Sequence, residues 1–509
     1  MLSNTIRRPI FTVLAATLIL VLFTADYGHG AAKEKVLRVG LNSEADTLDP
    51  HLSTQLAERY VSYAVFNNLV GYDENFNPVP ELAVSWRNPN PTTYVFKLRE
   101  GVKFHDGSDF NASVVKWNLD RVLNPDTKSP YRGLLAPIKS VEVTGPYEVK
   151  MNLEGPFPGL LALLGDRVGF MLPPDVVQKS PADFGKRPIG TGPYKFVERV
   201  KDDHVTLEKF SGYWNKSKPP NFDKIIFRPI PDTSVREAQL RGGESDIIDD
   251  ILPQDIKILE SSGVKVVGSV TGAFIEIGMR VDQPPLNNKA LRQAIAYAID
   301  RKQVIDTVAA GYGEPGRGPL AVGWAVNPNL RAYSFDLEKA KQKMKEAGLD
   351  KVTVDITVSA TPLYQQIGAI LQQHLGKIGV NVNLKPIDYA KHYSMQRDGS
   401  TYCFVERWTP RADPGVLMYM HFGKKGSANN QRYENTEVEK LLADANNIYD
   451  QAKRKEFLQK AEQLVMDDLP IAFIYYPKLF AAMSAKVTGF KFYPDTIIRV
   501  RDLDFVAGN

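Results

Sequence analysis

Apolar and polar residues alternate over 352–358 (VTVDITV), and this period of two predicts a half-buried strand. A second alternating run covers 380–384. Between them lies a stretch with apolar residues at helical spacing, which opens at Thr361 and Pro362 and is followed by Gly379. Thr and Pro are typical of a helix start and Gly of the position after a helix end. This order predicts a right-handed strand-helix-strand crossover in a parallel sheet.

The same patterns predict further elements along the chain. Strands are expected over 36–42 and 401–408, and helices over 288–300 and 337–347. Strands and helices alternate, which indicates a mixed α/β fold. Ligands of parallel sheets bind beyond the carboxyl ends of the strands. Ser359 and Thr361, which follow the strand over 352–358, are therefore candidate ligand-binding residues.

The first thirty residues are predicted to be a signal peptide. Arg7 and Arg8 precede an uncharged apolar run over 10–23, and small residues allow cleavage after Gly30 or Ala32. The run is shorter than a membrane-spanning helix needs, although an uncleaved anchor is the alternative. No cysteine lies near the cleavage zone, so we expect no lipid anchor and a periplasmic location. No later stretch is apolar for long enough to span a membrane.

Charge and cysteine content exclude several classes of protein. The 509 residues carry 63 Lys and Arg against 59 Asp and Glu, a net charge of +4. So small a charge, without a basic stripe, argues against a nucleic-acid partner. Cys403 is the only cysteine, so the chain has no internal disulfide, and its place in a predicted strand indicates an inert core residue. The length predicts several domains.

Motifs in a fixed order then suggest a family. The block over 80–122 begins PELAVSW and contains GVKFHDG, PIGTGPYKF follows at 188–196, and PPLNNKALRQAIAYAIDRKQVI covers 284–305. Shorter matches lie between and after these blocks. The chain resembles the family 5 solute-binding proteins, which are peptide, nickel and oligosaccharide receptors of bacterial ABC importers. The resemblance covers nearly all of the sequence after the signal peptide.

The resemblance implies a two-lobed periplasmic binding protein type II-like fold (cluster C), with an extra subdomain in the first lobe. Lobe I would take 33–66, 190–280 and 480–509. The extra subdomain would take 67–189, and lobe II would take 281–479. Two chain crossings, near 279–284 and 476–484, would form the hinge between the lobes.

The function implied is that of an extracytoplasmic receptor, not an enzyme. It would capture a peptide or a related small polar solute by hinge closure and deliver it to the membrane permease. The implied partners are ABC permease and ATPase subunits, and the receptor is expected to be a monomer without a cofactor. A receptor used for sensing or scavenging, without transport, is an alternative.

One loop departs from the family pattern for peptides. Peptide receptors of this family bind the ligand's α-amine with an aspartate after a W-x-x-D pattern, but here WTPRADP (408–414) places Arg411 at that position. The resemblance gives Asp413 a more structural role. No basic residue follows the strand over 352–358, where dipeptide receptors bind the ligand carboxylate. Since a buried guanidinium needs an anionic partner, Arg411 favours a ligand with carboxylate, phosphate or sugar oxygens. In the alternative, Arg411 pairs with a nearby acid such as Asp413 and only holds the loop.

Further candidates carry a structural alternative each. Trp408 would stack on a ligand or pack as core, and Tyr402 shares its strand face by the period of two. Ser43 and Glu44 follow the first strand and are candidates for the opposite jaw. Asp413 would contact the ligand or cap a helix.

Metal and catalytic motifs are missing from the sequence. The histidines form no pair at ligand spacing, although a metal chelate remains possible as ligand because it brings its own donors. No nucleophile elbow, Walker loop or dinucleotide fingerprint is present. Ligands without a free amine, such as an opine-like compound or an oligosaccharide, are the alternative to peptides. A secreted hydrolase with paired carboxylates such as Glu406 and Asp413 is a remote one.

Overall fold

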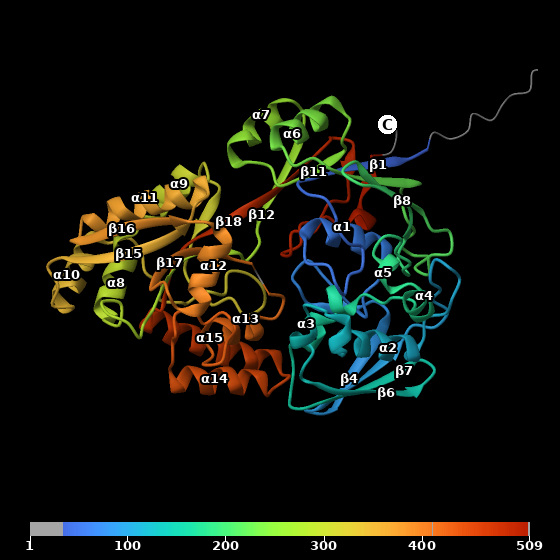
Figure 1. The fold of residues 1–509 in the computed structure, drawn as a ribbon, viewed down its shortest axis with the longest axis horizontal. Coiled ribbons are helices and arrows are strands. Elements are labelled where there is room, and N and C mark those ends of the chain that lie inside the picture. The colour runs from blue at the N-terminus through green and yellow to red at the C-terminus, as the bar shows by residue number, and fades with distance from the viewer. Residues whose placement is uncertain (1–33, 410, 507–509) are drawn as a thin grey trace, which may run out of the picture. The chain divides into compact units, whose positions relative to one another are not determined.

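The computed structural model describes residues 34–409 and 411–506, and residues 35–509 form one compact unit. The predicted signal peptide over 1–30 lies outside the described residues. The central element is a twelve-stranded mixed sheet built around one long strand, β18 (Ile471–Met483) (Figure 1). Since β18 pairs with strands from distant parts of the chain, it ties the fold together.

The other strands of this sheet come from both halves of the chain. In spatial order the main path reads β16 (Val380–Ile387), β15 (Val352–Ser359), β17 (Cys403–Trp408), β13 (Phe274–Met279), β18, β11 (Ile247–Asp249), β1 (Val36–Leu41), β10 (Lys224–Pro229), β9 (His204–Lys209) and β8 (Tyr194–Val200). Two further strands, β12 (Lys265–Val270) and β14 (Gly313–Pro315), pair with β18 beside this path.

Strand β18 changes partners halfway along its length. Its first half, up to Pro477, pairs with β13 and β14, and its second half, from Lys478, pairs with β12 and β11. The chain also passes between these two groups of strands at 271–273, where β12 leads into β13. This passage lies before the predicted crossing at 279–284, because β13 continues the pairing of β17 and the first half of β18. The second passage lies within the predicted 476–484.

Three main hydrophobic cores accompany this topology. One is built from residues 274–476, one mainly from 37–66, 170–227 and 483–503, and one from 69–171. The third core packs on a separate antiparallel sheet with the order β4 (Ala83–Asn90), β5 (Thr93–Leu98), β7 (Glu148–Leu153) and β6 (Ile138–Gly145). In contrast to the predicted boundary at 280, β13 belongs to the first of these cores.

The predicted crossover over 352–387 is confirmed in detail. Strands β15 and β16 are parallel neighbours, with Val352 opposite Val380, and α11 (Pro362–Gly376) connects them. Thr361 is the N-cap residue by backbone conformation, although its side chain makes no capping hydrogen bond. Gly379 has a φ of +86°, a left-handed conformation that favours glycine over residues with a Cβ atom.

The remaining helices pack against the sheets (Figure 1). Those of eight residues or more are α1 (Leu56–Val65), α2 (Ala112–Leu123), α6 (Thr233–Gly242), α8 (Lys289–Ala298), α9 (Arg301–Val308), α10 (Leu337–Glu346), α12 (Tyr389–Asp398), α13 (Pro414–Phe422), α14 (Thr436–Asn446) and α15 (Gln451–Asp468). The shorter helices are α3 (Leu160–Leu163), α4 (Pro174–Lys179), α5 (Pro181–Phe184) and α7 (Ile256–Ser261). The predicted helices at 288–300 and 337–347 correspond to α8 and α10, each capped by the preceding Asn288 or Asp336 side chain.

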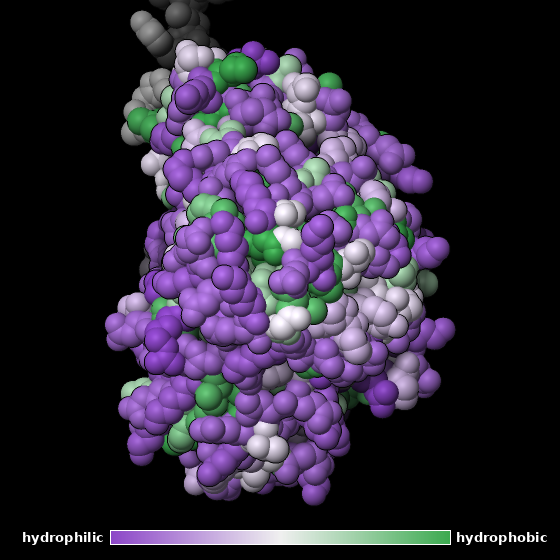
Figure 2. Space-filling view, turned by 90° about the vertical axis from the view of Figure 1, so that its left-hand side faces the viewer, coloured by the Kyte–Doolittle hydropathy of each residue, from purple (hydrophilic) through white to green (hydrophobic). Residues whose placement is uncertain are grey.

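In the part of the chain that the structure describes, no helix has both the length and the apolar character to cross a bilayer. The face drawn in Figure 2 is mainly hydrophilic, and its hydrophobic residues form small separate patches. Most apolar side chains of the described residues are therefore buried in the cores.

Candidate functional site

The structure contains a cavity of about 790 Å³ beside the two passages of the chain. Its wall includes Thr271 and Ala273 at the first passage and Leu479 to Ala481 of β18 at the second. The loop after β17 contributes Thr409, Arg411 and Asp413, and α1 contributes Arg59 and Tyr60. Ligand pockets for small molecules have volumes of about 300–1,000 Å³, so this cavity has room for a molecule of several residues.

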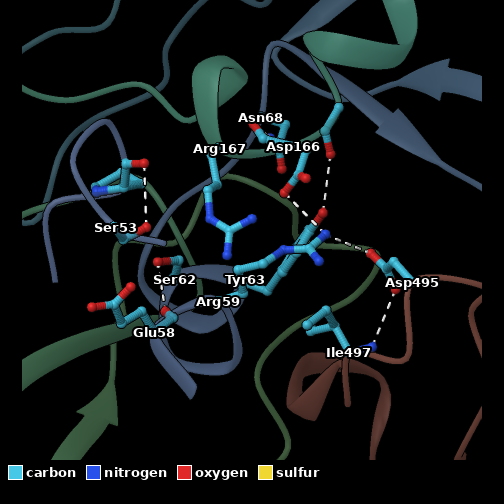
Figure 3. Close-up of polar contacts among 12 residues, drawn as sticks. Ser53, Glu58, Arg59, Ser62, Tyr63, Asn68, Asp166, Arg167, Asp495 and Ile497 are labelled. Atoms are coloured by element: carbon cyan, nitrogen blue, oxygen red, sulfur yellow. Dashed lines mark hydrogen bonds and ion pairs between the residues drawn. The ribbon is translucent and has the colours of Figure 1, made fainter. Parts of the chain in front are cut away.

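One wall of the cavity carries a cluster of arginines, which we call the arginine wall: Arg59, Arg167 and Arg411. Figure 3 shows Arg59 between Asp166 and Asp495, with Arg167 beside it. The Nη2 atom of Arg59 lies 3.0 Å from a carboxylate oxygen of each acid. Asp495 is in turn bound by both guanidinium nitrogens of Arg499, at 2.6 and 2.7 Å. Because Asp495 is shared in this way, the arginine wall carries more positive than negative charge.

The Arg167 guanidinium makes few polar contacts with the described residues. Its Nη2 donates to the carbonyl oxygens of Thr54 and Gln55, at 3.1 and 2.9 Å. Its Nε is buried without a hydrogen-bond partner, and its guanidinium forms no ion pair with any described residue. Desolvation and the nearby Arg59 lower the pKa of Arg167. An anion at this point would relieve both effects.

Arg411 lies in the cavity wall but keeps an exposed side chain. Its Nη1 donates to Thr409, at 3.1 Å to the hydroxyl and 3.4 Å to the carbonyl oxygen. Desolvation lowers the pKa of Arg411, Asp166 opposes this effect, and the charges of Arg59 and Arg167 add to it. The guanidinium therefore shares one electrostatic environment with the arginine wall.

Unpartnered polar atoms gather around the cavity. Five buried atoms without a hydrogen-bond partner belong to residues that line it: Arg59 Nε, the Tyr72 hydroxyl, Arg167 Nε, Asp249 Oδ2 and the Thr271 hydroxyl. Buried polar groups are normally satisfied, and each exception calls for an explanation. A polar ligand that binds in the cavity would provide one.

The opposite charge lies at the carboxyl end of β11, where Asp249 and Asp250 line the same cavity. Asp249 is 4% exposed, and desolvation raises its pKa to about 7. Asp250 is exposed and accepts a hydrogen bond from Asn42 at 2.9 Å. The cavity therefore has a basic and an acidic side.

Asp413 lines the cavity but is engaged in structure. Its two carboxylate oxygens accept from Arg454 at 2.9 Å each, and both side chains are buried. The Asp413 side chain also caps α13 by accepting from the Val416 N–H at 3.0 Å. The loop thus uses this acid to hold α13 and α15 together, and Arg411 does not take it as a partner.

Trp408 is not among the residues that line the cavity. Its Nε1 donates to Glu276 Oε1 at 3.0 Å, and its ring packs edge-on against His421 at 4.5 Å. Glu276 faces Glu406 across the β13 and β17 pair, and burial raises the pKa of both carboxyls. Trp408 therefore serves the packing behind the loop.

The structure places the other predicted site residues away from the cavity. Ser359 is buried in β15, and Thr361 starts α11. Tyr402 precedes β17, is 48% exposed and lies over the Arg280 guanidinium. Glu44 binds Arg199 at 2.7 Å, and Ser43 donates to Asn42 at 3.1 Å. Of the eight predicted residues, only Arg411 and Asp413 lie in the cavity wall.

Sequence patterns missed most of the wall. Asn42 directly follows β1 and lines the cavity, whereas the predicted Ser43 and Glu44, the next two residues, do not. Asp249 and Asp250 follow the short buried run of β11, and two acids directly after a buried strand were a usable signal. Arg59, Arg167 and Asp495 are far apart in the sequence, and no spacing joins them.

No group of three or more His, Cys, Asp or Glu side chains arranged to hold a metal ion occurs in residues 34–409 and 411–506. Cys403 is fully buried and unpaired, and desolvation raises the pKa of its thiol to about 12. A thiol so far from ionisation is unreactive, as a core role predicts.

The chain is similar to known proteins over nearly its full length. The model of the bacterial extracellular solute-binding proteins, family 5 Middle, matches residues 77–430. The glutathione-binding protein GsiB of Pectobacterium atrosepticum is 32% identical over 488 residues, which cover 93% of this chain and 94% of that protein.

Solved structures show the same fold. HbpA2 from Haemophilus parasuis matches with a TM-score of 0.84 and 26% identity, and covers 92% of this chain and 100% of its own. DppA from Helicobacter pylori, in complex with the peptide STSA, matches with a TM-score of 0.76 and 25% identity over 92% of this chain and 98% of its own. The predicted fold class, a two-lobed binding protein of mixed α/β structure, is confirmed. So is the predicted role of a solute-binding receptor of an ABC importer. The chain belongs to the bacterial extracellular solute-binding proteins of family 5.

Proposed function

We propose that this receptor captures a short peptide-like solute that carries carboxylate groups and delivers it to the permease of an ABC importer. One observation carries the choice of ligand: the arginine wall, in which Arg167 has a buried, unpartnered Nε and no ion pair with any described residue. A carboxylate binds guanidinium groups through charge-assisted hydrogen bonds, often two at a time. A ligand carboxylate would supply the negative charge that balances the arginine wall.

The rest of the cavity suits the same kind of ligand. Its wall combines charged groups with aromatic side chains, among them Tyr60, Tyr72, Tyr131, Phe480 and Tyr493. Small-molecule sites commonly pair an apolar lining with a few placed polar groups. The unpartnered Tyr72 and Thr271 hydroxyls offer additional hydrogen bonds to peptide groups.

Two relatives support a peptide-like ligand. GsiB is named for glutathione, and the structure of DppA contains a four-residue peptide. Glutathione is a tripeptide with two carboxylates and one amine, so it fits both the size of the cavity and its charges. Glutathione is therefore the first compound to test with this chain.

Transport would follow from binding at the two passages. A ligand that contacts Arg411 on the loop after β17 and Arg167 beside α1 touches residues of two different cores, and its binding favours a conformation with both contacts made. The receptor would be exported to the periplasm through its signal peptide, act as a monomer and dock on permease and ATPase subunits. It would release the ligand chemically unchanged.

A screen of ligands by thermal unfolding tests this proposal. The panel for residues 33–509, refolded from denaturant to remove bound ligand, holds glutathione, di- to pentapeptides, an opine, an oligosaccharide and nickel–histidine. A ligand at 100 times its Kd adds about 2.7 kcal/mol of stability, a shift that is easily measured. Stabilisation by glutathione or other peptides supports the proposal, and stabilisation by the oligosaccharide alone contradicts it.

An anionic ligand without a free amine is the second candidate. It is favoured by Arg411, which stands where peptide receptors of the family carry the amine-binding aspartate. An opine-like compound would still use the arginine wall. In the panel, this candidate predicts that the opine stabilises the receptor and that free-amine peptides do not.

Catalysis by paired carboxylates has no support in the cavity. Asp413 is held by Arg454, and Glu406 is buried beside Glu276 and accepts from Gln396 at 2.9 Å. A hydrolase needs two carboxyl groups that face one substrate. Incubation with glycosides and peptides is expected to leave them unchanged while binding remains stoichiometric.

A further inference from the structure

We propose that Asp249 and Asp250, which we call the acidic pair, form the subsite for the ligand's ammonium group at the carboxyl end of β11. This inference rests on the proposed function and extends it, because it defines the ligand as a zwitterion with a free amine. It also explains how a receptor with arginine in the loop could still select peptides.

Strand topology brings the acidic pair to the cavity. Strands β1 and β11 are parallel neighbours, and β12 runs in the same direction because both β11 and β12 are antiparallel to β18. Their carboxyl ends carry Asn42, the acidic pair and Thr271, all of which line the cavity. Ligands of such sheets bind beyond this edge.

The two carboxylates of the acidic pair share one cation among the described residues. Asp249 Oδ2 is buried and accepts no hydrogen bond, and Oδ1 accepts from the Asn42 N–H at 3.0 Å. The nearest cation is the buried Arg236, whose Nε lies 3.8 Å from Oδ1. The Arg236 guanidinium donates hydrogen bonds to backbone carbonyls instead. Its Nε donates to Asp249 O at 3.1 Å, and its Nη2 donates to Asp250 O at 2.8 Å.

The electrostatics of Asp249 agree with a missing cation. Burial is the main cause of its raised pKa, the charge of Arg236 opposes this effect, and the charge of Asp250 adds to it. An ammonium group beside the pair would favour the ionised carboxylate and bring this pKa down. Asp250 itself is exposed, with a φ of 50°, and its side chain is held by Asn42. It offers a carboxylate that a ligand can reach directly.

Helix α1 contributes one residue to the arginine wall and the next residue to the surroundings of the acidic pair. Arg59 and Tyr60 are consecutive residues of α1 and both line the cavity. Arg59 points to Asp166 and Asp495, whereas the charge of Asp249 raises the pKa of the Tyr60 hydroxyl, which places Tyr60 beside the acidic pair. A zwitterionic peptide across α1 would place its carboxylate on one side and its ammonium on the other.

The test compares one peptide with its N-acetyl form. The tightest-binding peptide of the panel is titrated by calorimetry into wild type, Asp250→Asn and Asp249→Asn, with Asp398→Asn, an exposed acid outside the cavity, as the matched control. We expect wild type and the control to bind the free-amine peptide at least about tenfold more tightly than the acetylated one. In Asp250→Asn this preference should fall to about threefold or less, because the free-amine peptide weakens and the acetylated peptide does not.

The outcomes separate the two proposals. Unchanged binding of the acetylated peptide shows that a variant is folded. If wild type binds peptides but both variants keep the preference for the free amine, the subsite is overturned and the receptor function stands. The subsite is equally overturned if wild type binds both forms alike. If wild type binds no member of the panel, the proposed function fails and the subsite with it.

Discussion

Single residues of the loop after β17 differ in role: some are proposed to bind the ligand, and others stabilise the fold. Arg411 is exposed in the cavity wall, and its Nη1 donates to Thr409. Asp413, two residues later, is buried and held by Arg454. The same short loop therefore contains one residue whose loss should affect binding and one whose loss should affect stability.

Replacing Arg411 with alanine should weaken binding of carboxylate-bearing peptides by about 10- to 100-fold, because a hydrogen bond to a charged group contributes about 1.5–3 kcal/mol. Calorimetric titration measures this change. Arg331→Ala, an arginine with a 75% exposed side chain outside the cavity, is the matched control and should bind as wild type does. Equal affinities for the two variants would rule out a ligand contact of Arg411.

Replacing Asp413 with alanine should destabilise the protein by about 3–5 kcal/mol, because it leaves the buried Arg454 charge without its partner. The variant also loses the cap of α13. Urea unfolding measures the loss, with Asp398→Ala as an exposed control. A loss below about 1 kcal/mol would mean that Arg454 finds another partner.

At the scale of elements, β13 and β17 place two carboxyl groups face to face behind the cavity loop. Glu276 is fully buried and accepts from Trp408, and Glu406 is 4% exposed and accepts from Gln396. His392 lies 3.5 Å from Glu406, and desolvation lowers the pKa of His392, which keeps it neutral. The charge of Arg407 favours the ionised form of Glu406, but burial outweighs it and raises the pKa of both carboxyls.

This pair should make stability depend on pH. Burial raises the pKa of Glu276 and of Glu406 in the folded protein above the unfolded value of about 4.3. Unfolding therefore releases protons above that pH, and stability falls as pH rises until the folded pKa is passed. Glu276→Gln keeps the oxygen that accepts from Trp408 and removes one titrating group.

Urea midpoints between pH 5 and pH 8 check this expectation. The stability of wild type relative to Glu276→Gln should fall with rising pH, because buried histidines with lowered pKa values contribute equally to both proteins. Asp249 contributes a slope of the same sign to both proteins, so the difference between their curves isolates the carboxyl pair. Parallel curves would show that the pair does not hold a proton in the folded state.

The elements were easier to predict than the site, for a physical reason. Secondary structure depends on local patterns, and the crossover over 352–387, the helices α8 and α10 and the strand that holds Cys403 all follow from short stretches of sequence. The chain passes between the two groups of strands at 271–273, before the predicted 279–284. The strand β13 looks like any buried strand, and only its pairing with β17 and the first half of β18 assigns it to their group.

The cavity depends on contacts between distant residues. The ion pairs of Arg59 join it to residues 166 and 495, and no local pattern reports such a distance. Arg411 was accessible to sequence reasoning because a family motif marks its position. Trp408, in the same motif, was predicted either to stack on a ligand or to pack as core, and its Nε1 donates to Glu276.

At the scale of the whole molecule, the chain between the two groups of strands passes only through 271–273 and the middle of β18 in the described sheet. Two narrow passages beside the cavity suit a hinge that responds to a bound ligand. The peptide selected in the screen should therefore reduce the radius of gyration measured by small-angle X-ray scattering. Arg411→Ala at the same peptide concentration should show a smaller reduction, and an unchanged radius in wild type at saturation would exclude hinge closure.

If the arginine wall binds ligand carboxylates, removing the charge of those carboxylates should weaken binding. Wild-type protein is titrated by calorimetry with the tightest-binding peptide of the panel and with the same peptide after esterification of its carboxyl groups. Esters keep the size and the amine but lose the negative charge, so the account predicts at least about a 100-fold loss of affinity. Equal affinities for the acid and the ester would contradict the account and assign the arginine wall to the fold alone.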